Sequence, residues 1–422
     1  MKITNIHFDK YKQFENLRLD FTYPEGHPKA GQPLDKVCFI GQNGTGKTTI
    51  LDALSDWSKW FLYKKEKEVI RGLNNNRIHF TNENKKWTAE WIETDFIDKN
   101  PLLLYLNADI LSNILYLTKE KKEKQFVGTA QLDYDIKYAA FEQLEIIEID
   151  NNTAKEQWQR FFAAFENYDT KVLDKTKALL QTATTKNGEK LLQDFIAWKS
   201  NEENPRQGLA EQLNVFLHRF GLEMDVDNTD FYIALRTLNK SLELTPNQLS
   251  TGIIQIILTS VPIFTLRNNV STILIDEPER SLYPDTQRDI VNYYTKISRT
   301  SQFFFATHSP IIAAAFDPWE IVELYFDENN TVQQHLYYEG ERHITNYRIH
   351  PKYLRWDSIL IRMFGIDKEG NSERDDALVE LAKIKERMDI LKENNGKGTP
   401  EMQAIWQKFS DIAQKLDWRI TE

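Results

Sequence analysis

Short runs of apolar residues, each followed directly by polar or glycine positions, recur along this chain. Three of them lie at 37–40, 272–275 and 303–306, and none contains a charged residue. A run of this length bounded by turn residues is typical of a strand that is buried on both faces. The pattern predicts an α/β fold with a parallel sheet, and polar side chains at the carboxyl ends of its strands. Further strands are expected at 102–106, 231–236, 241–244, 321–326 and 332–338.

The interval 57–229 shows helical spacing instead. Three groups of apolar residues each fall on one face of a helix. They are Trp158, Phe161, Phe162 and Phe165, then Leu191, Leu192, Phe195 and Ile196, then Leu209, Leu213, Phe216, Leu217 and Phe220. Since no heptad pattern is sustained, a coiled-coil arm is not expected. The spacing favours a compact helical subdomain packed on the sheet, and a surface for a partner or for nucleic acid is compatible with it.

A second helical region occupies 351–422. A stripe of apolar positions runs through 373–392, and another helix is expected to begin after Thr399, because Pro400 and Glu401 follow this capping residue. The pattern predicts a helical hairpin. Its apolar faces either pack as a core or offer a docking surface.

The first apolar run leads into a glycine-rich segment. Residues 41–48 read Gly-Gln-Asn-Gly-Thr-Gly-Lys-Thr and fit the phosphate-binding P-loop pattern G-x-x-x-x-G-K-[ST]. A strand, a glycine turn and a helix N-terminus together present backbone N–H groups to an anion. The alternative is a glycine-rich turn with a surface lysine. The candidate nucleotide contacts are Gly41, Asn43, Gly44, Gly46, Lys47, Thr48 and Thr49, with the Lys47 charge on the β- and γ-phosphates and the Thr48 hydroxyl on Mg²⁺.

Two acids end the second apolar run. Asp276 is expected at the carboxyl end of a central strand, where open α/β sheets bind their ligands. A carboxylate there suits Mg²⁺, a hard cation that prefers oxygen ligands. Glu277 is then placed to accept a proton from an attacking water or to orient it. The alternative is two solvated acids at a strand end.

Two other segments have chemistry of their own. Ser250 is suited to cap a helix that begins near Thr251, and the free amides of that helix would form an outward-facing anion site that includes Gly252. His308 follows the third apolar run and precedes a proline. A histidine at a strand end is more often structural than functional, so its context has to decide.

The order of these segments carries a family resemblance. After the P-loop come Leu-Ser-Thr-Gly at 249–252, Asp-Glu-Pro-Glu at 276–279, Ser-Leu-Tyr-Pro-Asp at 281–285 and Thr-His-Ser-Pro at 307–310. With these motifs, and with 3–8 and 11–17 as paired opening strands, the chain resembles the ABC-type ATPases and specifically their SMC/RecF-like branch. The resemblance covers about 1–56 and 230–325. It implies an ATPase head in 1–56 and 230–350, a mainly helical insertion in 57–229 and a C-terminal helical extension in 351–422.

The same resemblance implies roles for single residues. Glu277 would act in catalysis, and His308 would contact the γ-phosphate and sense hydrolysis. Lys12 would lie near the nucleotide. Ser250 and Gly252 would bind the γ-phosphate held by a second subunit, so that two heads form a homodimer, or a higher oligomer, around Mg-ATP.

The chain departs from the family pattern at several positions. Thr251 and Ile253 replace residues of the LSGGQ signature, and Gln255 is expected to supply some of the missing polar contacts. Tyr283 stands where a histidine is frequent. These departures bear on the turnover rate more than on ATP binding. The Q-loop residue stays open among Asn107, Gln125 and Gln131.

Composition limits the other possibilities. The net charge of −10 argues against a chain whose whole surface binds nucleic acid, although a local basic groove remains open. The only cysteine, Cys38, can form no disulfide within the chain, which suits a reducing cytoplasm. No apolar run is long enough to span a bilayer and no signal peptide is recognised, so no membrane association is expected.

A narrower resemblance concerns biological context. The short insertion and the segment from Trp356 to Gly365 look similar to bacterial antiphage-defence ATPases, such as those of Septu and retron systems. This implies a sensor and scaffold that works with a separately encoded effector, a nuclease. An in-chain nuclease is not expected, because the D-x-D pairs at 133–135 and 225–227 precede Ser250 instead of following His308. The alternatives are a RecF-type DNA-repair ATPase and a nucleotide-clamped scaffold with negligible turnover.

Overall fold

The computed structural model describes most of the chain as two units. The described residues are 2–63, 70–71, 76–82, 85–92, 102–117, 146–153, 155–183, 187–336, 342–347, 350–364, 372–393 and 399–416. By their internal contacts the two units are Met1–Ile359 and Leu360–Glu422. All candidate site residues lie in the first unit. The second unit begins close to the extension that the sequence placed at 351–422.

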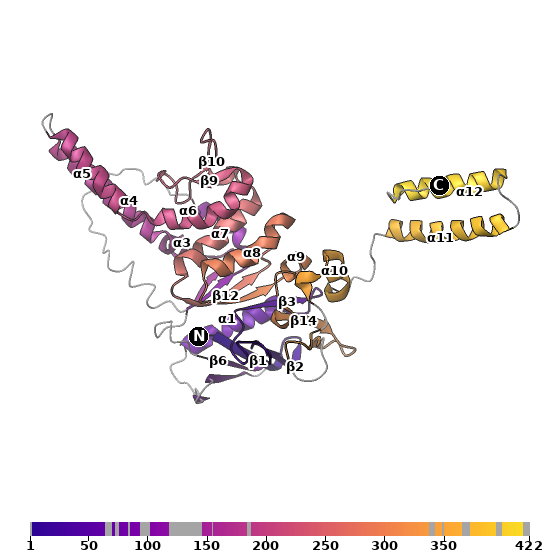
Figure 1. Cartoon of the computed structure of the whole chain (residues 1–422). Coiled ribbons are helices and arrows are strands. Elements are labelled where there is room, and N and C mark those ends of the chain that lie inside the picture. Colours follow the sequence, from indigo (N-terminus) through magenta and orange to yellow (C-terminus); the bar gives the residue numbers. More distant parts are fainter. Residues whose placement is uncertain are drawn as a thin grey trace. The chain divides into compact units, whose positions relative to one another are not determined.

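A seven-stranded sheet forms the centre of the first unit (Figure 1). Its neighbouring strands are parallel, except that β14 and β15 at one edge of the sheet pair antiparallel. Every residue of β12 and β13 is buried, as expected for their apolar runs. In spatial order the strands are β15 (Val332–Gln334), β14 (Ile321–Phe326), β3 (Lys36–Gly41), β13 (Gln302–Ala306), β12 (Val270–Asp276), β7 (Leu102–Leu106) and β8 (Ile146–Ile149). The parallel strands β3, β12 and β13 therefore end at one edge.

A second, antiparallel sheet faces the central sheet across helix α1 (Lys47–Tyr63) (Figure 1). Its opening strands pair as expected, with Tyr11 opposite Phe14 across a two-residue turn. In spatial order its strands are β2 (Phe14–Asp20), β1 (Lys2–Tyr11), β6 (Lys85–Ile92), β5 (Asn76–Asn82) and β4 (Ile70–Arg71). The first turns of α1 are consequently enclosed on two sides.

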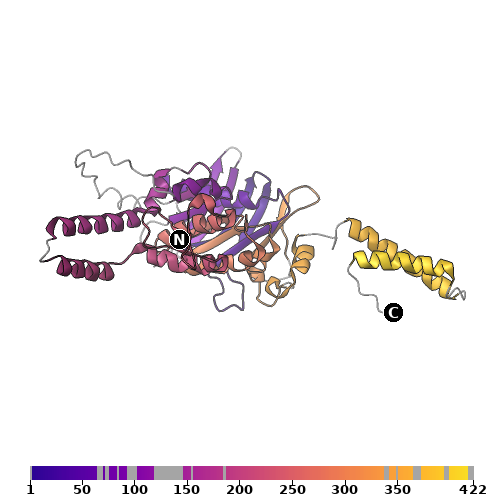
Figure 2. The ribbon, with the colours of Figure 1, turned by 90° about the horizontal axis from the view of Figure 1, so that it is seen from above.

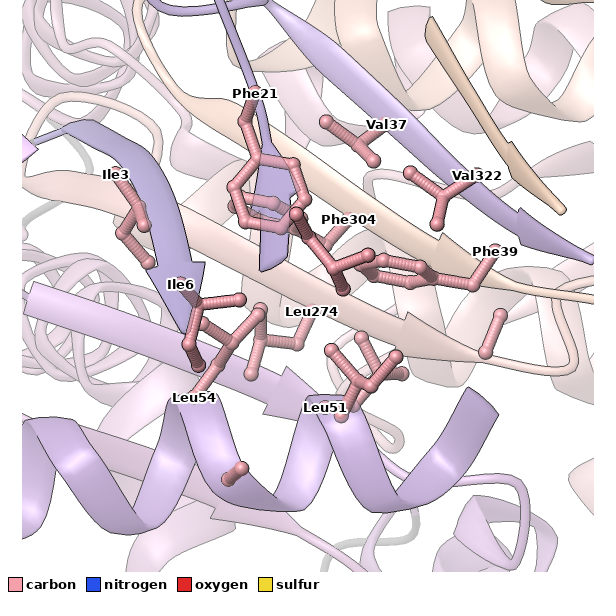
Figure 3. Close-up of a cluster of buried hydrophobic side chains, with 14 of the residues drawn as sticks. Ile3, Ile6, Phe21, Val37, Phe39, Leu51, Leu54, Leu274, Phe304 and Val322 are labelled. Atoms are coloured by element: carbon pink, nitrogen blue, oxygen red, sulfur yellow. The ribbon is translucent and has the colours of Figure 1, made fainter. Parts of the chain in front are cut away.

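One hydrophobic core joins both sheets to α1 (Figure 3). Ile6 of β1, Leu54 of α1 and Leu274 of β12 are fully buried in it. Phe304 of β13 packs edge-on against Phe21, with ring centroids 5.1 Å apart. Burying one such side chain stabilises the fold by about 1.5–3 kcal/mol. This core fixes where α1 begins, and hence where the P-loop lies.

Helices cover the other face of the central sheet (Figure 1). Helix α7 (Thr251–Leu266) is buried from Ile253 to Pro262, and α8 (Pro284–Ile297) buries one side. The short helix α9 (Pro310–Ala313) follows the histidine segment. In the described ranges, no helix is both long and apolar enough to cross a membrane.

The interval 57–229 differs in part from the expected helical insertion. Strands β4 to β8 come from this interval, yet they complete the two sheets of the head. Among the other described residues of the interval are a 3₁₀ helix at Ile110–Leu117, α3 (Lys155–Phe161), α4 (Ala163–Thr182), α5 (Gly188–Asn201), α6 (Pro205–Leu217) and a 3₁₀ helix at His218–Phe220. Strand β9 (Leu222–Met224) then pairs with β10 (Leu235–Thr237), and β10 pairs with β11 (Glu243–Leu244). Strand pairing between distant segments is not encoded in local spacing, so the sequence underestimated this contribution.

Helices α4 and α5 form an antiparallel hairpin that extends away from the sheets (Figures 1 and 2). Helix α5 has no buried residue, and the side chains of Leu192 and Ile196 are more than half exposed. The expectation of a compact subdomain is therefore wrong for this hairpin. The physical reason is that helical spacing shows which face is apolar, but not what covers that face. Helix α6 is different, because Leu209 and Leu213 are buried against the head.

The second unit is the expected helical hairpin. Helix α10 (Trp356–Phe364) spans the boundary between the units, and α11 (Ser372–Glu393) packs on α12 (Pro400–Lys415). Their core contains Leu381, Ile384, Met388 and Ile412. Thr399 caps α12 by accepting a hydrogen bond from the Met402 amide at 3.3 Å. Gly365 and the expected turn at 394–398 lie outside the described residues.

Candidate functional site

The P-loop connects β3 to the first residue of α1. Gly41, Gly44 and Gly46 all have positive φ angles, which an L side chain rarely adopts. At Gly46 there is also no room, because an added Cβ atom would overlap the side-chain amide of Gln13 and the ring of Phe14. The β1–β2 turn therefore closes over the loop. Asn43 and Thr49 lie in the same loop–helix segment.

The side chain of Lys47 is turned back onto this loop. Its Nζ atom donates to the carbonyl oxygens of Gly41 at 2.8 Å and Gln42 at 3.1 Å. Burial lowers the pKa of Lys47 to about 8, although the nearby carboxylates of Asp276, Glu279 and Glu277 raise it. An ammonium group held at a helix N-terminus beside free amides suits a polyphosphate.

Thr48 and Asp276 meet at the centre of the site. The hydroxyl of Thr48 donates to the Asp276 carboxylate, at 3.0 Å from Oδ2 and 3.2 Å from Oδ1. Burial raises the pKa of Asp276 to about 6, and the neighbouring charge of Glu277 raises it further, while the bond from Thr48 lowers it. A bound cation would stabilise the charged form of this carboxylate and so offset the cost of its burial. The donor set, a hydroxyl and a carboxylate oxygen, fits Mg²⁺.

Glu277 follows Asp276 in a strained backbone conformation. Its φ angle is +48°, in the left-handed region that non-glycine residues seldom adopt. Its amide donates to the carbonyl of Ala306 at 2.9 Å, so the β12–β13 pairing continues one residue beyond the strand. Such strain persists only where surrounding structure over-determines it, and it concentrates at functional sites.

His308 lies beyond the end of β13 and is exposed. Burial of part of its ring lowers the pKa of His308, and the positive charge of Lys47 lowers it further, while the negative charge of Glu277 raises it. The amide of Thr307, the preceding residue, donates to the carbonyl of Phe39 on β3 at 3.1 Å, so His308 follows a segment that lies between the P-loop strand and the strand that leads to Glu277. The structure thus brings together residues that the sequence selected from three separate strand ends.

Ser250 and Gly252 lie at the start of α7. Ser250 is the N-cap of this helix and accepts a hydrogen bond from the Ile253 amide at 3.5 Å. Ser250 and Thr251 are exposed, and in the described residues no hydrogen bond joins Ser250 to the P-loop of its own chain. Gly252 lies against the turn that follows β12, because a Cβ added to it would lie 2.7 Å from the carbonyl oxygen of Ser281.

The expectation for Gln255 is wrong. Its side chain is 1% exposed, and within the described structure its Oε1 atom accepts no hydrogen bond. Gln255 lies on the inner side of α7, so it cannot offer polar contacts to a second subunit. The helical rotation between Ser250 and Gln255 accounts for this difference.

Lys12 occupies the β1–β2 turn with a φ angle of +51°. Its Nζ atom lies 3.9 Å from Oδ2 of Asp52 and over the ring of Tyr11, 5.6 Å from the centroid. The neighbouring Gln13 donates to the carbonyl of Gly44 at 3.4 Å. The turn is therefore next to the P-loop.

A cavity of ≈ 330 Å³ opens beside α1, on the side of Lys12. Asn107, a Q-loop candidate, lines it at the end of β7, while Gln125 and Gln131 lie outside the described residues. The hydroxyl of Tyr105 donates to Oδ1 of Asp52 at 3.1 Å in its wall. The described residues that line it are Tyr11, Lys12, Asp52, Asp56, Tyr105, Asn107, Glu148, Ile149 and Asp150.

The sequence did not single out Asp52 and Glu279, although both border the site. Asp52 follows Thr48 by four positions on α1, so its spacing alone could have placed it on the same helix face. Oε1 of Glu279 accepts a hydrogen bond from the His308 amide at 2.8 Å. No local signal indicates this contact, because it joins the ends of two different strands.

Comparisons with known proteins agree with these motifs. A family model described as an AAA domain, putative AbiEii toxin, Type IV TA system, matches residues 36–314. The matched region extends from β3 to α9 and includes every candidate residue except Lys12. The Retron Ec83 probable ATPase of Escherichia coli is 21% identical over 408 residues, which cover 76% of this chain and 71% of that protein.

Solved structures of SMC heads also match. The SMC head domain from Thermotoga maritima is 16% identical, with 79% of this chain and 98% of that chain covered and a TM-score of 0.37. The Smc head domain with an extended coiled coil, bound to the C-terminal domain of ScpA derived from Pyrococcus furiosus, is 14% identical. The match covers 79% of this chain and 96% of that chain, with a TM-score of 0.37. The P-loop, the order of the motifs and the parallel central sheet are those of an ATPase domain of the AAA/ABC type. Because the family model matches well over half of its length, this chain belongs to the AAA-domain family of the putative AbiEii toxin.

Proposed function

We propose that this chain binds Mg-ATP, pairs with a second copy through the nucleotide and hydrolyses ATP slowly. The observation that carries this proposal is the meeting of Lys47, Thr48, Asp276, Glu277 and His308 at one edge of the central sheet. A polyphosphate at the N-terminus of α1 would be gripped by the P-loop amides and by the Lys47 charge. The other residues that we assign to phosphate binding are Gly41, Asn43, Gly44, Gly46 and Thr49.

Thr48 and Asp276 are the residues that would hold Mg²⁺, and this ion supplies neutralisation of charge on the β- and γ-phosphates when it is bound. Glu277 then orients the attacking water and accepts its proton. His308, whose pKa is lowered by burial of part of its ring, offers a hydrogen bond to the γ-phosphate. Lys12 is assigned to the nucleotide from its position on the turn that covers the P-loop.

Dimerisation is proposed from the orientation of α7. Ser250 and Thr251 are exposed at a helix N-terminus, where free amides attract an anion. In the described part of this chain, no hydrogen bond directs Ser250 to the P-loop, so a nucleotide bound to another copy is the ligand that fits. ATP then stabilises the dimer by mass action, because only the assembled pair uses both surfaces.

The biological role is proposed from the relatives. The curated relative is named for a retron, and the matching family for a toxin of a toxin–antitoxin system. We infer a sensor and scaffold in bacterial antiphage defence, with a separately encoded effector, a nuclease. Slow hydrolysis suits this role, because ATP would act as an assembly switch that persists until a trigger arrives.

The decisive experiment compares wild type with Glu277→Gln. Glu277→Gln keeps the shape of the site but removes the base, so we expect ATP binding to persist, turnover to fall at least about 100-fold, and ATP-dependent dimers to accumulate. Turnover is measured as phosphate release, and mass by light scattering after size exclusion, with and without Mg-ATP. A matched control is Glu328→Gln, an exposed acid in the turn after β14. Equal turnover in wild type and Glu277→Gln would contradict hydrolysis at this site, and a monomer under all nucleotide conditions would contradict the sandwich.

A further inference from the structure

The third acid of the segment after β12 has an unusual environment. Glu279 is half-buried as a residue, but its Oε2 atom is buried, and in the described structure this atom accepts no hydrogen bond. The Oε1 atom accepts a bond from the backbone amide of His308 at 2.8 Å. The side chain of Thr307 is a second hydrogen-bonding neighbour of this carboxyl group, and burial raises the pKa of Glu279 although these bonds lower it. A buried carboxylate oxygen that accepts no hydrogen bond is costly to the fold. Such a group is retained where its position has a use.

A second bridge joins the same two segments. Gln287 of α8 donates from Nε2 to the carbonyl of Leu282 at 2.8 Å. Its Oε1 atom accepts a bond from the hydroxyl of Ser309 at 2.7 Å. The turn after β12 and the histidine segment after β13 are therefore held together at two points, one at the backbone of His308 and one at the residue that follows it.

The turn itself has a defined shape. Glu277 and Ser281, two residues on either side of Glu279, have φ angles of +48° and +61°. The carbonyl oxygen of Ser281 lies where Gly252, at the start of α7, has no side chain. Glu279 consequently lies on a turn that contacts the tip of α7 on one side and the backbone of His308 on the other.

We propose that Glu279 is a positioning residue, whose carboxylate fixes the backbone of His308 so that the imidazole stays beside Lys47 and Glu277. This inference rests on the proposed ATP hydrolysis, because positioning of His308 matters only if His308 acts on the nucleotide. Glu279 does not need to touch ATP. Its effect on turnover passes through His308, and it connects that residue to the turn on which the tip of α7 rests.

This role differs in a measurable way from that of a carboxylate that only supports folding. A structural residue changes the melting temperature and the amount of active protein. A residue that acts through His308 changes kcat, leaves KM for ATP nearly constant, and loses its influence once His308 is gone, because groups that act as one unit are not additive.

The test is a double-mutant cycle in the full chain with Mg-ATP. We expect Glu279→Ala to lower kcat about 10- to 100-fold, the range for the loss of a hydrogen bond to a charged group, while KM changes less than about threefold. Glu279→Gln keeps an acceptor for the His308 amide and should retain kcat within about threefold. In the background of His308→Ala, the added Glu279→Ala should lower kcat by less than about threefold.

A matched control uses another buried acid that accepts a backbone amide. Glu320 accepts from the Asp317 amide at 2.8 Å and pairs with Lys36 at 3.3 Å, in the short 3₁₀ helix Pro318–Glu320. Glu320→Gln should leave kcat unchanged per folded molecule. If Glu279→Ala fails to fold, Glu279→Gln is compared instead with Glu279→Leu at matched melting temperature. Only the leucine variant should then show a lower kcat.

The possible results distinguish a failure of the role of Glu279 from a failure of the proposed ATP hydrolysis. Additive losses in Glu279→Ala/His308→Ala, or an unchanged kcat in Glu279→Ala, overturn the role of Glu279 while ATP hydrolysis stands. A wild-type chain that hydrolyses no ATP overturns both the proposed hydrolysis and the role of Glu279. A loss of kcat in Glu279→Ala that Glu279→Gln restores, and that vanishes without His308, supports the inference.

Discussion

Thr48 and Asp276 are 228 positions apart in the chain, yet the threonine hydroxyl lies 3.0 Å from one carboxylate oxygen of the aspartate and 3.2 Å from the other. Thr48 lies in the first turn of the helix after β3, and Asp276 ends β12, which is separated from β3 by β13. The parallel pairing of these strands brings the two ends together. The contact places the P-loop and the acidic strand end in one site.

The first prediction concerns the lysine of the P-loop. Lys47→Ala removes the ammonium group that would pair with the phosphates, so we expect ATP affinity to fall about 10- to 100-fold, as for a lost charged hydrogen bond. Isothermal titration with ATP and Mg²⁺ measures it. Lys29→Ala is the control, because Lys29 is exposed and pairs with Asp35 away from the loop. An unchanged affinity in Lys47→Ala would place the nucleotide elsewhere.

The second prediction concerns the tip of α7. Ser250→Arg puts a long side chain at the exposed N-cap, where it would keep a second subunit away. We expect this variant to bind ATP with wild-type affinity but to remain monomeric in the background of Glu277→Gln, which otherwise accumulates dimers. Analytical ultracentrifugation with Mg-ATP gives the mass. Ser200→Arg on the exposed hairpin should still dimerise, and ATP-dependent dimers of Ser250→Arg would refute the assignment of this surface.

The third prediction concerns the anchor of the α4–α5 hairpin. The guanidinium of fully buried Arg206 makes two hydrogen bonds to Asp169, at 2.7 and 2.9 Å, and lies over the ring of Phe165. Asp169→Ala leaves a buried charge without this partner and should lower the free energy of unfolding by about 3–5 kcal/mol. Asp169→Leu combined with Arg206→Met should lower it by less, because no buried charge remains.

Urea unfolding followed by circular dichroism measures these differences. The exposed pair of Lys171 and Glu202 provides the comparison. Lys171→Ala should change the unfolding free energy by less than about 1 kcal/mol, because water screens that pair. If Asp169→Ala were as mild as Lys171→Ala, the Arg206 pair would not anchor the hairpin.

The fourth prediction is a pH dependence of stability. Burial raises the pKa of Glu323 on β14 to about 8, and within the described residues its Oε2 atom accepts no hydrogen bond. Between the ordinary glutamate pKa and about 8, the folded chain binds this proton and the unfolded chain has lost it. Unfolding therefore releases a proton in this window, so the contribution of Glu323 to stability declines as pH rises and levels off above about pH 8.

Glu323→Gln should abolish this decline, since glutamine does not titrate. We expect the melting temperature of the variant to exceed that of wild type by an increasing margin between pH 5 and pH 8. Scanning calorimetry at several pH values provides the measurement, with exposed Glu328→Gln as a control. A constant difference between variant and wild type across this range would show that Glu323 is not protonated in the fold.

Several elements follow from local sequence. The strands at 37–40, 272–275 and 303–306 and the capped helix after Thr399 appear where spacing and turn residues predicted them. These features depend on residues within one or two turns of each other. The candidate residues of the P-loop and of the segment after β12 could also be named, because each set forms a contiguous motif in the sequence.

Other features depend on contacts between distant segments. Local spacing gave no sign that β5 and β6 extend the N-terminal sheet or that α5 stays uncovered. It suggested a polar role for Gln255, whereas the packing of α7 buries that side chain. In each case the spacing of apolar residues predicts which face of a helix or strand a residue lies on. Which segment packs against that face depends on the whole fold.

The amino-acid sequence by itself determined the phosphate loop, the acids and histidine at the ends of buried strands, and the α/β class, since each depends on short-range backbone geometry. Only the tertiary structure decided that the Glu279 carboxylate bonds to the backbone of His308 and that Ser281 contacts Gly252. The physical reason is that hydrogen bonds and close packing act over a few ångströms in space, and the pairing order of parallel strands selects which distant residues come within that range.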